Sequence, residues 1–129
     1  ALAGVEVELM LPERTDSRLT TFAANSYLSQ LLEAGVKIYQ YREGFLHSKL
    51  LMVDDRIASI GSANMDFRSL EHNFEISGIV YDSGITKRLL SLFEADKKSC
   101  QLLTATEWEK RSGFTRLAES FMRLFAPML

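Results

Sequence analysis

Residues 46–64 read LHSKLLMVDDRIASIGSAN, and this stretch decides the fold that we expect for the chain. Two mainly apolar segments are separated by the charged triplet 54–56, which is typical of a tight turn between two strands. We therefore expect a strand over residues 46–53 and a returning strand over residues 57–60, which together form a β-hairpin.

The segment before this hairpin has the pattern of a strand, a helix and a second strand. Residues 5–11 begin with an alternating apolar pattern. Asp16 or Ser17 is suited to cap a helix that Gly35 would end, and residues 36–41 form the next strand. The short joints between these elements predict a parallel pair of strands with a right-handed crossover.

The segment after the hairpin mixes irregular and regular structure. Residues 61–71 are polar and should be irregular, residues 73–81 should form a strand, and residues 85–99 have helical spacing. Short helices are expected within residues 104–129, the first opened by a capping box at Thr104. The predicted fold class is α/β, with a mixed central β-sheet flanked by α-helices in an αβα sandwich, and the whole chain forms a single domain.

Composition limits the classes of function. The chain has 129 residues, 47% hydrophobic and 25% charged, which fits a folded globular domain. Its formal net charge of −2 argues against nucleic acid as a partner. The single cysteine, Cys100, allows no disulfide within the chain. No apolar run reaches the length of a membrane span. Because the chain begins at Ala1, we expect it to be a piece of a longer protein.

Two groups of residues have the side chains that phosphate chemistry uses. His47 and Lys49 lie two residues apart, so an imidazole and an ammonium group share one face of the predicted strand. Gly61 permits a close approach of the backbone to a ligand, and Ser62 and Asn64 offer a hydroxyl and an amide to phosphate oxygens. Each group also has an ordinary structural interpretation, the first as a solvent-exposed strand face and the second as a plain turn.

A carboxylate follows on the next predicted strand. Glu75 shares a strand face with Asn73, and a carboxylate on a neighbouring strand can bond an imidazole and hold its tautomer. Taken alone, a single glutamate such as Glu75 is more often a solvated surface residue.

Together these residues form one spaced pattern: His47-x-Lys49-x4-Asp54, then Gly61-Ser62-x-Asn64, then Glu75. The pattern resembles the HKD signature of the phospholipase D superfamily. The similarity to bacterial cardiolipin synthases, specifically to their C-terminal half with the second HKD motif, covers essentially the whole chain and is carried by residues 33–39, 61–69, 73–75 and 124–129.

The resemblance implies a phospholipase D-like domain that supplies one half of a catalytic site. Two such half-sites meet around one phosphate; one histidine attacks phosphorus, and the other exchanges protons with the leaving and incoming alcohols. We favour the acid–base role for His47, and which histidine attacks stays open. Lys49, Ser62 and Asn64 would bind the phosphoryl oxygens, and Glu75 would orient His47. No metal or other cofactor is expected.

Other polar residues of the region are expected outside the chemistry. Asp54 belongs to the signature, but it falls at the turn and by alternation on the face opposite His47, so we expect it to brace the structure. Asp66 and Arg68 are expected to form an ion pair that holds the loop, with a contact between Arg68 and the substrate head group as the alternative. We expect His72 to lie outside the site.

The resemblance implies phosphatidyl transfer between two phosphatidylglycerol molecules, which gives cardiolipin and glycerol. The implied partners are phosphatidylglycerol and cardiolipin, the N-terminal HKD half of the same protein, and the surface of the bacterial cell membrane, where segments absent from this chain would anchor the enzyme. The isolated chain should be inactive. Two alternatives remain: a single-motif nuclease or phosphodiesterase that completes its site as a homodimer, and a non-catalytic phosphate- or lipid-binding module.

The last predicted helix begins after Gly113 and ends at Pro127. Its apolar stripe contains Leu117, Phe121, Leu124 and Phe125. The stripe can dock onto the sheet or dip into a membrane interface, and the sequence favours docking.

Overall fold

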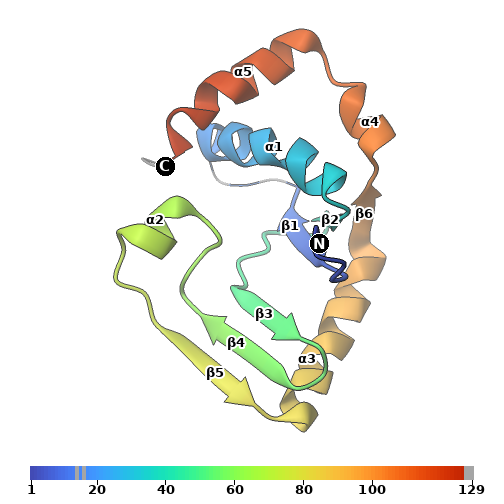
Figure 1. The fold of residues 1–129 in the computed structure, drawn as a ribbon, viewed down its shortest axis with the longest axis vertical. Coiled ribbons are helices and arrows are strands. Elements are labelled where there is room, and N and C mark those ends of the chain that lie inside the picture. The colour runs from blue at the N-terminus through green and yellow to red at the C-terminus, as the bar shows by residue number, and fades with distance from the viewer. Residues whose placement is uncertain (14, 16, 127–129) are drawn as a thin grey trace. The chain divides into compact units, whose positions relative to one another are not determined.

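The computed structural model describes residues 1–13, 15 and 17–126, which group into two compact units (Figure 1). Unit 1 consists of Ala1–Leu46 with Ser99–Leu129, and unit 2 consists of His47–Lys98. The predicted cap at Asp16 and the predicted helix end at Pro127 lie outside the described residues. The organisation of the whole chain as a single domain stays a prediction.

Unit 1 contains a three-stranded sheet with the order β1-β2-β6. Strands β1 (Glu8–Pro12) and β2 (Lys37–Tyr41) are parallel, as the strand–helix–strand pattern predicted. Strand β6 (Cys100–Leu103) pairs antiparallel with β2 and was not predicted. Its four residues are too few to show a strand period, so only the pairing with β2 reveals it.

The helices of unit 1 follow the capping signals of the sequence. Helix α1 (Arg18–Glu33) begins after Ser17, whose side chain accepts the Thr20 N–H, and Gly35 adopts a left-handed φ of 85° just past its end. Helix α4 (Ala105–Glu109) opens with the predicted capping box at Thr104.

Helix α5 (Gly113–Arg123) packs against α1, as Figure 1 shows. The core cluster of unit 1 comes from α1, the sheet, the residue before β2 and α4, and it consists of Leu28, Val36, Ile38, Leu103 and Trp108. Among the helices of the described residues, none combines the length and apolar character needed to cross a membrane.

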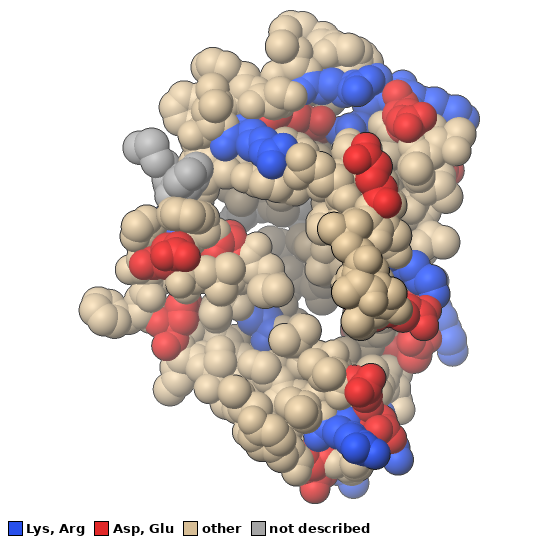
Figure 2. Space-filling view, in the orientation of Figure 1, with Lys and Arg blue, Asp and Glu red and all other residues tan. Residues whose placement is uncertain are grey.

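Unit 2 contains a second three-stranded sheet, with the order β3-β4-β5 and antiparallel pairing throughout. Its strands are β3 (Leu50–Val53), β4 (Ile57–Gly61) and β5 (Ser77–Tyr81), so the predicted hairpin is confirmed. Helix α3 (Ser83–Asp96) packs on β3 and β4, where Ala58 and Thr86 are fully buried, and the short 3₁₀ helix η1 (Lys97–Ser99) follows it. On the side of this unit seen in Figure 2, uncharged side chains cover much of the sheet.

The predicted α/β class is confirmed, but three details differ from expectation. The described strands form two sheets of three rather than one central sheet. Strands β3 and β5 begin at Leu50 and Ser77, so the preceding residues are not part of the regular ladder. The segment expected to be irregular contains a short helix, α2 (Phe67–Glu71), because the Asp66 carboxylate caps it by accepting the Ser69 N–H at 2.8 Å.

Gly61 is required by the sheet itself, and the predicted close approach of a ligand to its backbone stays a prediction. A Cβ at Gly61 would lie 2.3 Å from Ser77 Oγ, 2.4 Å from the Ile76 carbonyl oxygen and 2.7 Å from Ser77 Cα. Two of these three atoms are backbone atoms at the start of β5, so β4 and β5 can pair at this point only because Gly61 has no side chain.

We expect Gly61→Ala to lower the free energy of unfolding by about 1–3 kcal/mol, because the added methyl forces the two strands apart. Urea unfolding measures this loss. The matched control is Gly78→Ala in the same sheet, since a Cβ there would meet its nearest heavy atom, the Ile60 carbonyl oxygen, at an ordinary 3.8 Å. Equal stability of the two variants would contradict the steric argument.

Candidate active site

The predicted site residues gather at one end of the unit 2 sheet. His47 and Lys49 immediately precede β3, Ser62 and Asn64 follow the end of β4, and Glu75 precedes β5. Because the three strands alternate in direction, the start of β3, the end of β4 and the start of β5 meet at the same edge. Residues that are up to 28 positions apart are thus brought together by the antiparallel pairing.

The backbone around Lys49 continues the ladder beyond the regular part of β3. The Gly61 N–H donates to the Lys49 carbonyl oxygen at 3.1 Å, which sets Lys49 opposite the last residue of β4. The Lys49 Nζ donates to the His47 carbonyl oxygen at 2.9 Å. The ammonium group is therefore held beside His47, and the His47 side chain is exposed at the edge of the unit.

Glu75 is held by hydrogen bonds from both sides. The Ser62 hydroxyl donates to Glu75 Oε2 at 2.5 Å, and the Asn73 Nδ2 donates to Glu75 Oε1 at 3.3 Å. Ser62 is itself held in place, because its Oγ accepts the Ile76 N–H at 3.1 Å and its own N–H donates to the Ile76 carbonyl oxygen at 2.9 Å. The carboxylate is thus positioned before any substrate arrives.

These contacts lower the pKa of Glu75 below its ordinary value. The bond from Ser62 is the largest cause, and bonds from Asn73 and Ser69 and the positive charge of Lys49 act in the same direction, while partial burial opposes them. Glu75 is therefore ionised at neutral pH. The pKa of Glu75 is lower in the folded chain than in the unfolded chain, so the ionised carboxylate stabilises the fold. This contribution to the free energy of unfolding is fully present above the unfolded-state pKa. It is lost as the pH falls through the folded-state pKa.

The Ser62 hydroxyl already has an acceptor within the site. A hydroxyl has one proton, and the shortest acceptor of the Ser62 proton is Glu75. Contacts of Lys49, Ser62 and Asn64 with the phosphoryl oxygens stay predictions. Asn64 lies exposed in the loop between β4 and α2, two residues beyond Ser62.

We expect Ser62→Ala to raise the pKa of Glu75 towards its ordinary value, because the variant removes the largest cause of the shift. If the reaction requires the ionised carboxylate, the acidic limb of the kcat/KM profile of the full-length protein moves to higher pH. The control is Ser83→Ala, an exposed hydroxyl at the start of α3. An acidic limb that does not move would show that Ser62 does not tune Glu75.

Asp54 lies at the other end of the hairpin. It follows the last residue of β3 and adopts a left-handed φ of 52° in the turn, where an aspartate is tolerated better than most residues. Asp54 comes five residues after Lys49 along extended chain, a span of about 16 Å. This placement favours the predicted structural role for Asp54, although the signature includes it.

The loop residues next to the site take part in local structure. Asp66 caps α2, and the ion pair between Asp66 and Arg68 stays a prediction. The His72 ring packs edge-on against Phe67 with 5.4 Å between ring centroids. Exposed apolar side chains also occur in this segment of unit 2, namely Met65, Leu70, Phe74 and Ile76.

Two partners of Glu75 had no assigned role in the sequence. Asn73 is two residues before Glu75, so the two-residue period of extended chain puts both side chains on one side and could have indicated their contact. Ser69 is buried and lies near Glu75 only because α2 folds the loop back, and no local pattern signals this. Orientation of His47 by Glu75 stays a prediction.

The α/β fold, with the predicted histidine, lysine and glutamate at one end of a sheet, is that of a phospholipase D-like domain. Residues 1–97 match the protein family described as "Cardiolipin synthase, PLD-like domain". The chain belongs to this family.

Curated relatives match over the full length of the chain. Cardiolipin synthase 1 of Staphylococcus epidermidis is 46% identical, and the chain covers 26% of its length. Cardiolipin synthase of Clostridium perfringens is 45% identical and is covered over 27% of its length. Cardiolipin synthase 2 of Bacillus cereus is 43% identical and is covered over 25% of its length. The chain thus spans about a quarter of the length of these relatives.

Two solved structures share the fold at 18% sequence identity. The phospholipase D family member Nuc from Salmonella typhimurium superposes with a TM-score of 0.67 over 78% of this chain and 66% of its own. The phosphatidylserine synthase of Haemophilus influenzae Rd KW20 superposes with a TM-score of 0.66 over 98% of this chain and 34% of its own.

Proposed function

We propose that the protein containing this chain transfers a phosphatidyl group between two phosphatidylglycerol molecules, and that this chain supplies one of two HKD half-sites. The observation that carries the proposal is the gathering of His47, Lys49 and Glu75 at one edge of the unit 2 sheet. Membership of the cardiolipin synthase family supports the choice of substrate.

In the proposed reaction, the histidine of the other half-site attacks phosphorus, and the bond from phosphorus to the glycerol oxygen breaks. His47 gives its proton to the departing glycerol and then takes a proton from the hydroxyl of the second phosphatidylglycerol. That hydroxyl attacks the phosphohistidine, which releases cardiolipin and restores both histidines. Phosphodiester bonds are exchanged one for one, so the reaction needs no nucleotide.

The remaining side chains create the electrostatic setting for this exchange. The Lys49 ammonium and the Asn64 amide stabilise the negative charge that builds on the phosphoryl oxygens. Glu75, ionised and held by Ser62 and Asn73, favours the protonated imidazole that the acid–base cycle produces. The exposed apolar side chains in the same segment of unit 2 suit a substrate with acyl chains or the surface of the other half-site.

The proposed partners are phosphatidylglycerol, cardiolipin, the other HKD half-site of the same protein and the surface of the bacterial cell membrane. The membrane location is supported by the nature of the substrate, which is a bilayer lipid. A single half-site holds only one of the two histidines, so we expect the isolated chain to be inactive.

The test uses the full-length protein with phosphatidylglycerol vesicles and no nucleotide. We expect cardiolipin and glycerol to appear in equal amounts. Release of phosphatidic acid without cardiolipin would indicate a hydrolase. Cleavage of plasmid DNA by a homodimer of the isolated chain would instead establish the single-motif nuclease, and phosphate binding without turnover would establish a binding module.

A further inference from the structure

Helix α5 exposes its apolar side. The stripe consists of five large apolar residues, with exposed fractions of 81% for Phe114, 68% for Leu117, 59% for Phe121, 73% for Leu124 and 40% for Phe125. The rings of Phe121 and Phe125 pack edge to face at 5.5 Å, so the stripe continues past the helix end. In Figure 2 uncharged side chains form the outer edge along α5.

The opposite side of α5 is polar and faces α1. Glu119 is only 3% exposed, and its Oε2 accepts a hydrogen bond from Arg111 at 2.5 Å. The Arg111 guanidinium in turn lies 3.4 Å from the centroid of the Trp108 ring. A helix ordinarily buries its apolar stripe and exposes its polar side, and α5 does the reverse.

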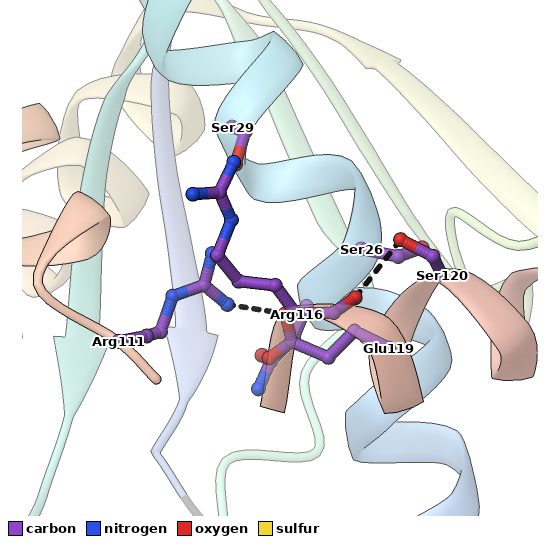
Figure 3. A pocket seen from close by; sticks show the side chains of 7 residues that line it. Ser26, Ser29, Arg111, Arg116, Glu119 and Ser120 are labelled. Carbon is purple, nitrogen blue, oxygen red and sulfur yellow. Dashed lines mark hydrogen bonds and ion pairs between the residues drawn. The ribbon is translucent and has the colours of Figure 1, made fainter. Parts of the chain in front are cut away.

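Further contacts hold this orientation. The Arg123 guanidinium lies 4.4 Å from the centroid of the Tyr27 ring, and its Nη2 donates to Gln30 Oε1 at 3.1 Å. A polar cavity of about 110 Å³ lies between the two helices. In Figure 3, Arg116 reaches along it towards Ser29. Turning the stripe inward would place phenylalanine rings against this polar wall and break the buried Arg111–Glu119 pair.

The segment that contains the stripe carries a basic surplus, which suits an anionic surface. Residues 110–123 contain four basic residues and one acidic residue, whereas the chain as a whole has a net charge of −2. The acidic residue, Glu119, is buried and paired, so the exposed charges of this segment belong to Lys110 and to Arg116 on the polar side of α5. Phenylalanine and leucine on one side of a helix and basic residues on its polar side are the pattern of a helix that lies in a membrane interface.

We propose that the α5 stripe, Phe114–Phe125, inserts into the interface of a bilayer that contains anionic phospholipid. The stripe is about 16 Å long and would lie parallel to the membrane, with its side chains reaching about 5–10 Å into the interface. The proposal rests on the proposed function only in that the substrate is a bilayer lipid, and its test needs no turnover.

The first test labels single cysteines with the environment-sensitive fluorophore NBD in full-length protein whose native cysteines, including Cys100, are replaced by serine. Leu117→Cys and Phe121→Cys report on the stripe, and Ser120→Cys, on the same helix outside the stripe, is the matched control. The membranes are vesicles of equal parts phosphatidylcholine and phosphatidylglycerol. We expect a blue shift at 117 and 121, with quenching by nitroxides on the acyl chains, and neither effect at 120.

Absence of nitroxide quenching at 117 and 121 would overturn the proposal. A blue shift without quenching would also overturn it, because the stripe would then be covered by protein, either another part of the full-length chain or a second copy. Since binding is measured directly, quenching in a protein that makes no cardiolipin would uphold this proposal while the proposed function fails.

A second variant separates membrane contact from damage to the fold. We expect Leu117→Glu combined with Phe121→Glu to lose turnover of phosphatidylglycerol in vesicles and to keep turnover of a short-chain, water-soluble phosphatidylglycerol. The control, Ser120→Glu, adds a charge to the same helix and should retain both activities. Full turnover of vesicles by the double variant would overturn the proposal.

Discussion

The variant His47→Ala of the full-length protein should form no cardiolipin. His47 lies exposed at the sheet edge, with the Lys49 ammonium bound to its carbonyl oxygen, and the proposed reaction requires its proton both to release glycerol and to activate the second alcohol. Loss of a general acid–base residue typically costs about 10²–10⁴-fold in rate, and here two successive steps depend on it. Product formation from phosphatidylglycerol vesicles measures the effect, and cardiolipin formation at the normal rate would refute the assignment.

The same variant distinguishes the two roles of a histidine in such a site. A p-nitrophenyl phosphodiester has a leaving group that needs no proton, so it can react in the absence of the general acid. If His47 is the acid–base residue, His47→Ala should still release one burst of nitrophenol as the other histidine is phosphorylated. A variant without a burst would make His47 the nucleophile. His72→Ala is the control, since its ring packs on Phe67, and it should leave turnover intact.

The second large effect is expected for Glu75→Gln, which should lower kcat by about 10–1000-fold on the scale of lost acid–base support. The glutamine keeps the shape but removes the negative charge, and its amide nitrogen faces a donor, either Ser62 or Asn73, that now has no acceptor. Because the change acts on the transition state, KM should move little.

The matched control for this variant is Glu71→Gln, which removes an exposed carboxylate from the neighbouring α2. It should keep the activity of the unaltered protein. If Glu75→Gln and Glu71→Gln behave alike, Glu75 is a solvated surface residue and the hydrogen bonds around it serve structure alone.

The membrane proposal and the half-site proposal concern different units of the chain. The half-site residues belong to His47–Lys98, and the α5 stripe belongs to the unit formed with Ser99–Leu129. Their tests are therefore independent: the NBD labels report on α5 whether or not transfer occurs, and His47→Ala removes transfer without touching α5.

Local sequence determined much of this molecule. The hairpin over β3 and β4, the parallel pair of β1 and β2, and the caps at Ser17 and Thr104 follow from alternation and hydrogen-bonding side chains within a few residues. The spacing of His47, Lys49, Asn64 and Glu75 likewise predicted the half-site. This prediction does not depend on the exact bounds of the strands, because it uses only the order of residue types along the chain.

Only the tertiary structure decided how those residues work together. Antiparallel pairing brings Ser62 to Glu75, so the Ser62 hydroxyl donates a hydrogen bond to the carboxylate. The same pairing leaves no room for a side chain at Gly61. Neither contact follows from spacing along the chain. The same holds for α5, whose periodicity reveals a stripe but not its direction. The buried Arg111–Glu119 pair turns the stripe outward, because the energies of ion pairing and burial depend on neighbours that only folding supplies.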